Sequence, residues 1–300
     1  MKTTAILTVL SATFFAVTNG KSEAPEGNTP EPIKVFLVDD QSGVELKTKH
    51  GIQPLQVDDI LVLVNAVLLG HTPVQLVHQA IDEDVSDNPA TQLVFKPFAG
   101  DPPPTAPTPN MPLREFTELA TQFKKDREKW QNSILAYRNE VVADAETFIQ
   151  KVEATQLEVA QRMDQKLQLR NGRDYNRSDI CGSIAVGNRV LGNSGKRVII
   201  FNSDCDDCPG KRRPRKTPLT QTDLDPGIEL IFVNTSRIPE RSILFTGLKN
   251  SMRHADSMKE AMEIVVEMLK PQADTTSATA AQKANPLTTF TETISPPQQQ

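Results

Sequence analysis

Three short apolar runs constrain the fold of this chain more than any other feature. They read KVFLV from Lys34, RVIIF from Arg197 and ELIFV from Glu229, and none alternates with polar residues. A strand with one solvated face alternates, whereas a strand that is buried on both faces is apolar throughout. The runs therefore predict a mainly parallel sheet with helices on both sides, which is a doubly wound, Rossmann-like α/β fold.

The segments around these runs supply the other elements of one domain over residues 33–270. Apolar residues at helical spacing predict helices over 55–69, 179–191 and 255–269. Strand-like runs are found over 33–38, 74–81, 91–98, 197–201, 228–233 and 243–245. An acidic turn separates the second and third of these strands, and a Pro-rich connector over 99–112 follows the third.

A long stretch without glycine or proline, residues 113–170, predicts an inserted helical arm. Its aromatic residues recur every seven positions, which is the spacing of a coiled coil. They are Phe116, Phe123, Trp130 and Tyr137. An unbroken helix would be roughly 85 Å long, so we expect a break near 142–145 or 154–155, or a helical hairpin. The aromatic row either packs on the sheet or on the second half of the arm, or joins copies of the chain into a homo-oligomer.

The two ends of the chain differ in composition from its centre. Residues 1–20 combine Lys2, an uncharged apolar run and small residues before a cleavage point, which is typical of a signal peptide. This run is shorter than the roughly 20 apolar residues of a membrane span. Residues 21–32 are a polar linker, and residues 271–300 are a low-complexity tail that we expect to be disordered. We therefore predict an exported protein, periplasmic or extracellular, without an integral membrane span.

Charge and motifs exclude two broad function classes. The net charge of −5 gives no electrostatic basis for nucleic-acid binding. We interpret the basic run 211–216 as a solvated loop. The sequence contains no Ser-His-Asp spacing, no Walker loop and no GxGxxG, so we predict a binding protein rather than an enzyme.

Three polar clusters lie beside predicted elements, where a parallel sheet would bring them together. The first is Asp40-Gln41-Ser42-Gly43-Val44 after a strand, the second is Ser178-Asp179 before a helix, and the third is Ser203-Asp204 after a strand. An aspartate at such a position also serves as a helix cap or turn former. Carboxylate and hydroxyl oxygens that converge at one edge are, however, the ligands that Mg²⁺ and Ca²⁺ prefer.

The stretches VFLVDDQSGV, SDICGSIAVGNRVL and RVIIFNSDCDD resemble, in this order, three motifs of von Willebrand factor A domains. Those motifs are Asp-x-Ser-Gly-Ser after the first strand, a Thr-Asp step before a later helix, and Ser-Asp-Gly after the fourth strand. The resemblance implies a metal-ion-dependent adhesion site for Mg²⁺ or Ca²⁺. In it, Asp40 and Ser42 contact the cation or its waters, Ser178 replaces the threonine, and Asp204 is the remaining carboxylate. The last ligand would be an acidic side chain of a protein partner.

Two departures from the family pattern leave two functional hypotheses open. Val44 occupies the place of the second serine, so one oxygen ligand is lost and the site is degenerate. The segment between Ser42 and Ser178 is also long, which resembles exported bacterial members of the family, including those of cyanobacterial type. The chain is then either a partner-binding protein with a working cation site, or an assembly protein with a vestigial site that self-associates through the helical arm.

The three cysteines of the chain are Cys181, Cys205 and Cys208. Two aspartates lie inside the C-x-x-C motif, and negative charge there disfavours a reactive thiolate. We therefore predict a structural disulfide, either between Cys205 and Cys208 or from one of them to Cys181.

Overall fold

A computed structural model describes residues 31–40, 54–69, 72–82, 85, 88–101, 103–107, 112–169, 178–203, 205, 218–233 and 244–269. The predicted signal peptide 1–20, the predicted tail 271–300 and the basic run 211–216 lie outside the described residues. So does the linker, except for its last two residues.

Six strands form one mixed sheet with the order β3-β2-β1-β4-β5-β6, and the fold is α/β, as the apolar runs predict. The strands are β1 (Ile33–Asp40), β2 (Val74–Ile81), β3 (Ala90–Phe95), β4 (Lys196–Asn202), β5 (Ile228–Val233) and β6 (Met252–Ala255). Only the pairing of β2 with β3 is antiparallel. Because β1 lies between two parallel neighbours, its last residue is at the centre of the carboxyl edge of the sheet.

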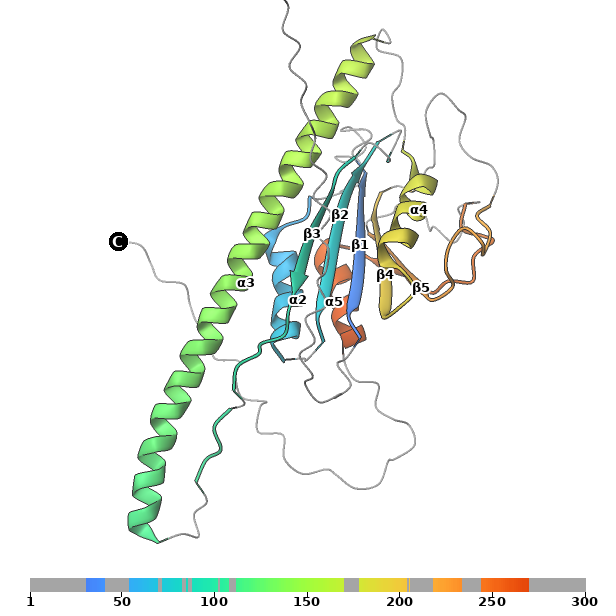
Figure 1. Cartoon of the computed structure of the whole chain (residues 1–300). Coiled ribbons are helices and arrows are strands. Elements are labelled where there is room, and N and C mark those ends of the chain that lie inside the picture. Colours follow the sequence, from blue (N-terminus) through green and yellow to red (C-terminus); the bar gives the residue numbers. More distant parts are fainter. Residues whose placement is uncertain are drawn as a thin grey trace, which may run out of the picture.

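Helices cover both faces of this sheet (Figure 1). One core contains residues of α2 (Val57–Leu69), α5 (Met258–Leu269) and the second half of the long helix α3, together with Ile33, Val35 and Leu37 of β1. The other core contains Phe36 and Val38 of β1 with residues of α4 (Ile180–Leu191). Successive side chains of a strand point to opposite faces, so each apolar run of the sequence supplies both cores.

A cluster of aromatic rings anchors the core on the α4 face. Phe201 stacks on Phe232 with ring centroids 5.3 Å apart, and Phe245 meets both rings edge to face. Gly187 lets α4 approach closely, because a β-carbon there would lie 2.8 Å from the ring of Phe36. Phe201 and Phe232 lie in the carboxyl halves of β4 and β5, so the cluster packs on this part of the sheet.

The prediction of a break or hairpin in the long helix was wrong. Helix α3 runs unbroken from Leu113 to Leu169, 57 residues, and Figure 1 shows its first half extending well beyond the sheet. Its second half is buried against the sheet and α2, with Ala145, Phe148 and Val152 in the core. Within the described residues, no helix has the length and apolar character needed to cross a membrane.

The segment after β3 packs on the first half of α3. Trp130 Nε1 donates to the Asp101 carbonyl over 3.1 Å, and the Tyr137 hydroxyl donates to the Lys96 carbonyl. Phe98 packs edge to face on Tyr137, with ring centroids 5.5 Å apart. The four predicted aromatic residues are all half-buried, while their helical neighbours are mostly exposed. Trp130 and Tyr137 of the aromatic row therefore pack on the segment after β3, and Tyr137 also packs against the core that the sheet forms with α2.

Two strand boundaries also differ from the prediction. The third strand ends at Phe95, because the following residues leave the sheet to run along α3. The strand predicted at 243–245 is absent from its described part, where Leu244 and Phe245 lie in a turn. Their apolar side chains are buried in the α4-face core rather than paired in a strand. The edge strand is instead β6, which pairs in parallel with β5 although its sequence, MRHA, lacks an apolar run.

Candidate functional site

Asp40 is the centre of the candidate site, at the carboxyl end of β1. Its side chain is almost fully buried, and the residue is only 3% exposed. Carboxylate oxygen Oδ2 accepts hydrogen bonds from the Ser178 hydroxyl over 2.7 Å and from the Ser203 hydroxyl over 2.8 Å. Three segments that are far apart in the sequence thus place acidic and hydroxyl oxygens at one point.

The start of α4 holds Ser178 in place. Asp179 is the N-cap of this helix, and its carboxylate accepts from the backbone N–H of Gly182 over 2.8 Å. The backbone N–H of Asp179 donates to the carbonyl of Asp82, just after β2, over 2.7 Å. The hydroxyl of Ser178 is therefore positioned by a helix cap on one side and by the end of a neighbouring strand on the other.

The turn after β4 holds Ser203. Its hydroxyl oxygen accepts from the backbone N–H of Cys205 over 3.0 Å while the hydroxyl donates to Asp40. Cys205 has a φ of 59°, in the left-handed region that favours glycine. The chain thus adopts a conformation that is costly for a cysteine, and this turn directs the Ser203 hydroxyl toward β1.

The structure brings together two of the four predicted ligand residues, Asp40 and Ser178. Ser42 and Asp204, like Val44, lie outside the described residues. Ser203, which was recognised as part of a polar cluster but not as a ligand, takes a place beside Asp40. Its sequence signal was a hydroxyl residue two positions after the apolar run RVIIF. Within the described part of the chain, no three His, Cys, Asp or Glu side chains gather around one point.

The chemistry of these side chains fits a hard divalent cation. One carboxylate and two hydroxyl groups offer only oxygen atoms, and oxygen is the ligand that Mg²⁺ and Ca²⁺ prefer. The carboxylate is buried, and a low-dielectric surrounding strengthens its attraction for a cation. Asp40, Ser178 and Ser203 are therefore the described residues that would hold the ion.

The preceding residue, Asp39, serves the opposite face of the sheet. Its carboxylate accepts from Asn202 Nδ2 over 3.1 Å and from Gln156 Nε2 of α3, and it lies 3.5 Å from His78 Nε2. Asp39 and His78 are 1% and 0% exposed. No role for Asp39 was predicted from the sequence. The signal that was available is the doublet of aspartates at a strand end, because consecutive strand residues point to opposite faces.

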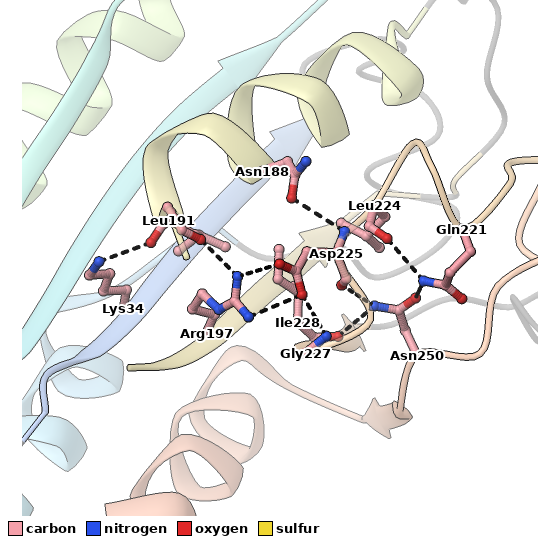
Figure 2. A network of polar contacts seen from close by, with 11 residues as sticks. Lys34, Asn188, Leu191, Arg197, Gln221, Leu224, Asp225, Gly227, Ile228 and Asn250 are labelled. Carbon is pink, nitrogen blue, oxygen red and sulfur yellow. Dashed lines mark hydrogen bonds and ion pairs between the residues drawn. The ribbon is translucent and has the colours of Figure 1, made fainter. Parts of the chain in front are cut away.

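A second polar network lies at the amino end of the sheet (Figure 2). The guanidinium of Arg197 binds both carboxylate oxygens of Asp225, over 2.9 and 3.0 Å, and donates to the Gly192 carbonyl. Asn250 donates to the carbonyls of Asp225 and Ile228. The guanidinium holds the pKa of Asp225 below its usual value, and a hydrogen bond from the Gly227 amide adds to this effect.

The cysteines remain only partly placed. Cys181 is half-buried on α4, and Cys205 is buried, with Sγ 3.7 Å from the Ser203 carbonyl oxygen. Cys208 lies outside the described residues, so the disulfide stays a prediction.

Comparison with known proteins gives a distant structural likeness. No family model matches the sequence, and no curated protein matches it. Among the solved structures that match is the pilus adhesin SpaC from Lactobacillus rhamnosus GG in an open conformation, with 9% identity and a TM-score of 0.37. The likeness covers 81% of this chain and 30% of the adhesin chain. This likeness is too distant to indicate a function for the chain.

Proposed function

We propose that this chain is an exported binding protein of von Willebrand factor A type, which engages a protein partner through a divalent cation at the carboxyl edge of its sheet. The observation that carries the proposal is the buried Asp40 carboxylate, which accepts from the hydroxyls of Ser178 and Ser203. Asp40 and Ser178 are two of the ligands that the resemblance implies, and Ser203 belongs to the third polar cluster, in which Asp204 was the predicted ligand.

Two features of the fold support the family resemblance. The carboxyl ends of β1 and β4, where the first and the third motif begin, lie side by side because β1 and β4 are neighbouring parallel strands. The third family motif has glycine after its aspartate, and Cys205 occupies that position with a positive φ of 59°. A glycine requirement at this point of the backbone is what the motif would lead us to expect.

A bound cation would supply a positive centre for an acidic side chain of the partner. Asp40 would neutralise part of its charge, and Ser178 and Ser203 would contribute uncharged oxygen ligands. With few charged ligands in the site, the ion retains positive charge and attracts a further carboxylate. This property suits adhesion and not hydrolysis, in keeping with the absence of a catalytic motif from the sequence. The proposal that the chain is exported rests on residues 1–20, which have the composition of a signal peptide.

The test is a titration of Mg²⁺, Ca²⁺ and Mn²⁺ into the full chain, by calorimetry and by thermal unfolding. We expect saturable binding and a rise in stability of about 2.7 kcal/mol at a hundred times the dissociation constant. Asp40→Asn should abolish both effects. The matched control is Asp126→Asn, which makes the same change on an exposed side chain in the first half of α3. An equal response in Asp40→Asn and the wild type would refute the proposal.

A second function, self-association through α3, is favoured by the surface of its first half. Two leucines there, Leu119 and Leu135, are 42% and 55% exposed, whereas the aromatic row beside them is half-buried. We propose that this half forms an arm that contacts a second copy of the chain. The double variant Leu119→Gln, Leu135→Gln should reduce the mass measured by analytical ultracentrifugation. Leu157→Gln, an equally exposed leucine on the second half, is the control.

A further inference from the structure

We propose that residues 287–294 of this chain add a strand to the sheet, antiparallel to β3 and on its outer edge, the side of β3 that faces away from β2. The inference is independent of the proposed cation site, because it concerns the edge of the sheet and not the carboxyl end of β1. It assigns an occupant to a row of backbone groups that has no partner among the described residues.

The outer edge of β3 is open. β3 is the first strand in the sheet order, and within the described chain it pairs only with β2 (Figure 1). In such a strand, alternate residues point their backbone N–H and C=O groups away from the neighbouring strand. Among the described residues, no hydrogen bond from α3 or from any other segment reaches the outward groups of residues 90–95. A row of unpaired backbone donors and acceptors is a template for a further strand.

The composition of β3 is that of a paired strand and not of an open edge. Its sequence, ATQLVF, contains no charge and no proline, whereas open edge strands are usually short or charged. The opposite edge has both protections, because β6 has four residues and its Arg253 forms ion pairs with Glu229 and Glu267. On β3, Val94 is 45% exposed on the face that α3 does not cover. An added strand would shield this side chain.

The tail over 271–300 contains one segment of strand-like composition. Residues 287–294 read LTTFTETI, and all but Leu287 and Glu292 are β-branched or aromatic, the types that strands favour. Pro286 and Pro296 bracket the run, and proline limits a strand to the residues between them. The rest of the tail is rich in alanine, glutamine and proline. A segment of this kind buries too little apolar surface to order alone, but it orders when it docks.

The end of α5 brings this segment within reach of β3. Lys196, at the start of β4, donates to the Met268 carbonyl, so the tail begins beside this end of β4. Four paired residues form one row across the sheet: Lys196, Ile33, Val74 and Phe95. The position outside Phe95 is therefore four strand spacings from Lys196, about 19 Å. Residues 270–288 would span about 24 Å as a random coil, so the linker matches the distance.

The same row of residues fixes the direction of the added strand. The tail arrives at the Phe95 end of β3, so residues 287–294 run from Phe95 toward Ala90, antiparallel to β3. With Phe290 opposite Val94, the largest side chain of the run lies on the exposed face, and only threonines face α3. The pairs are then Thr289–Phe95, Phe290–Val94, Thr291–Leu93, Glu292–Gln92, Thr293–Thr91 and Ile294–Ala90. Aromatic–β-branched and Thr–Thr pairs of this kind stabilise sheets.

The tail of the same molecule is the occupant, and not the tail of a second copy. A linker whose length matches the distance gives the tethered segment an effective concentration of about 1 mM at its site. At micromolar protein concentration, pairing within one molecule is therefore favoured by about a thousandfold over pairing between molecules.

The first experiment tests the register with a disulfide in the full chain. Gln92→Cys, at an exposed position, is combined with Glu292→Cys, its proposed partner. The control combines Gln92→Cys with Gln298→Cys, because a random coil would bring positions 292 and 298 to β3 at similar rates. We expect the 92–292 bond to form about tenfold faster or more, within one molecule. Mass spectrometry of the linked peptides distinguishes it from bonds of the native cysteines. Equal rates for the two pairs would refute the added strand, and a 92–292 bond between molecules would refute pairing within one.

The second experiment measures amide hydrogen exchange of residues 90–95 by NMR. Thr291→Pro removes a backbone N–H from the middle of the added strand. We expect the outward amides of β3 to exchange about tenfold faster or more in this variant than in the wild type. Thr276→Pro, in the linker before the strand, is the control and should leave the rates unchanged. If the outward amides of the wild type already exchange as fast as those of Thr291→Pro, the edge is open and the proposal fails.

Discussion

The two ends of the sheet hold buried charge in opposite ways. At the amino end, the buried cation Arg197 is matched by the carboxylate of Asp225 within the same chain. At the carboxyl end, two consecutive carboxylates, Asp39 and Asp40, accept from hydroxyl and amide groups. A guanidinium pair resists exchange because breaking it leaves a buried charge unpaired. Hydrogen bonds from neutral groups cost less to exchange, so the carboxyl end is suited to a ligand and the amino end to stability.

The largest effect that we expect comes from the amino end. Arg197→Met should lower the free energy of unfolding by about 3 kcal/mol, because it leaves Asp225 without its cation and the Gly192 carbonyl without a donor. The response to divalent cations should not change. Arg114→Met removes an arginine whose side chain is 94% exposed, and it should cost less than about 0.5 kcal/mol. Urea unfolding of both variants measures the difference. If Arg197→Met also lost its response to divalent cations, the two ends of the sheet would not have the separate roles described above.

Ser203→Ala tests the carboxyl end and should cost about 2 kcal/mol. The hydroxyl that it removes donates to a buried carboxylate and accepts from the Cys205 N–H. Unlike Arg197→Met, it should also weaken the response to cations. Ser133→Ala is the control, because that hydroxyl bonds only within the exposed surface of α3 and alanine favours the helix. If both serine variants unfold at the same urea concentration, the hydrogen bonds around Asp40 contribute nothing to stability.

A pair of variants at Cys205 tests the backbone conformation of the turn after β4, separately from its hydrogen bonds. Cys205→Gly should be more stable than Cys205→Ala by about 1 kcal/mol, because the positive φ favours glycine. The order should reverse at Cys181, within α4, where alanine is the better helix former by a similar amount. Thermal unfolding of the four proteins decides the matter. The same order at both positions would mean that the turn after β4 does not require a left-handed residue.

The sheet was predictable from the sequence because its central strands are buried on both faces, which leaves a local pattern. The runs from Lys34, Arg197 and Glu229 gave the central strands within one or two residues of their ends. Strand β6 left no such pattern, because its residues are only partly buried at the sheet edge. The contact of the aromatic row of α3 with the segment after β3 left no local pattern either, because it joins residues that lie tens of positions apart.

In the candidate site, the sequence predicted only those residues that lie directly beside a predicted strand or helix. Asp40 and Ser178 were identified from their places beside elements, and the structure brings them together. The role of Asp39 depends on Gln156, more than a hundred residues away. Arg197 and Asp225 were not identified either, because one begins a strand and the other lies in a loop. Neither position has a local pattern that reveals an ion pair.

That ion pair gives the smallest effect, a dependence of stability on pH. The Arg197 guanidinium lowers the pKa of Asp225 below its usual value of 3.8 in the folded protein. A lowered pKa adds stability above the unfolded value, and this stability is lost as the pH falls through the folded pKa. We therefore expect Asp225→Asn to be less stable than the wild type by about 0.5–1 kcal/mol at pH 7, since the Asp225 side chain is 32% exposed.

The difference between the two proteins should shrink below pH 3.8, as the wild-type carboxylate is protonated. Urea unfolding at pH 7, 5, 3 and 2 would measure it. Asp126→Asn, on an exposed position, should show no such trend. If the loss in Asp225→Asn were the same at every pH, the carboxylate charge would contribute nothing, and the amino end would be held by neutral hydrogen bonds as the carboxyl end is.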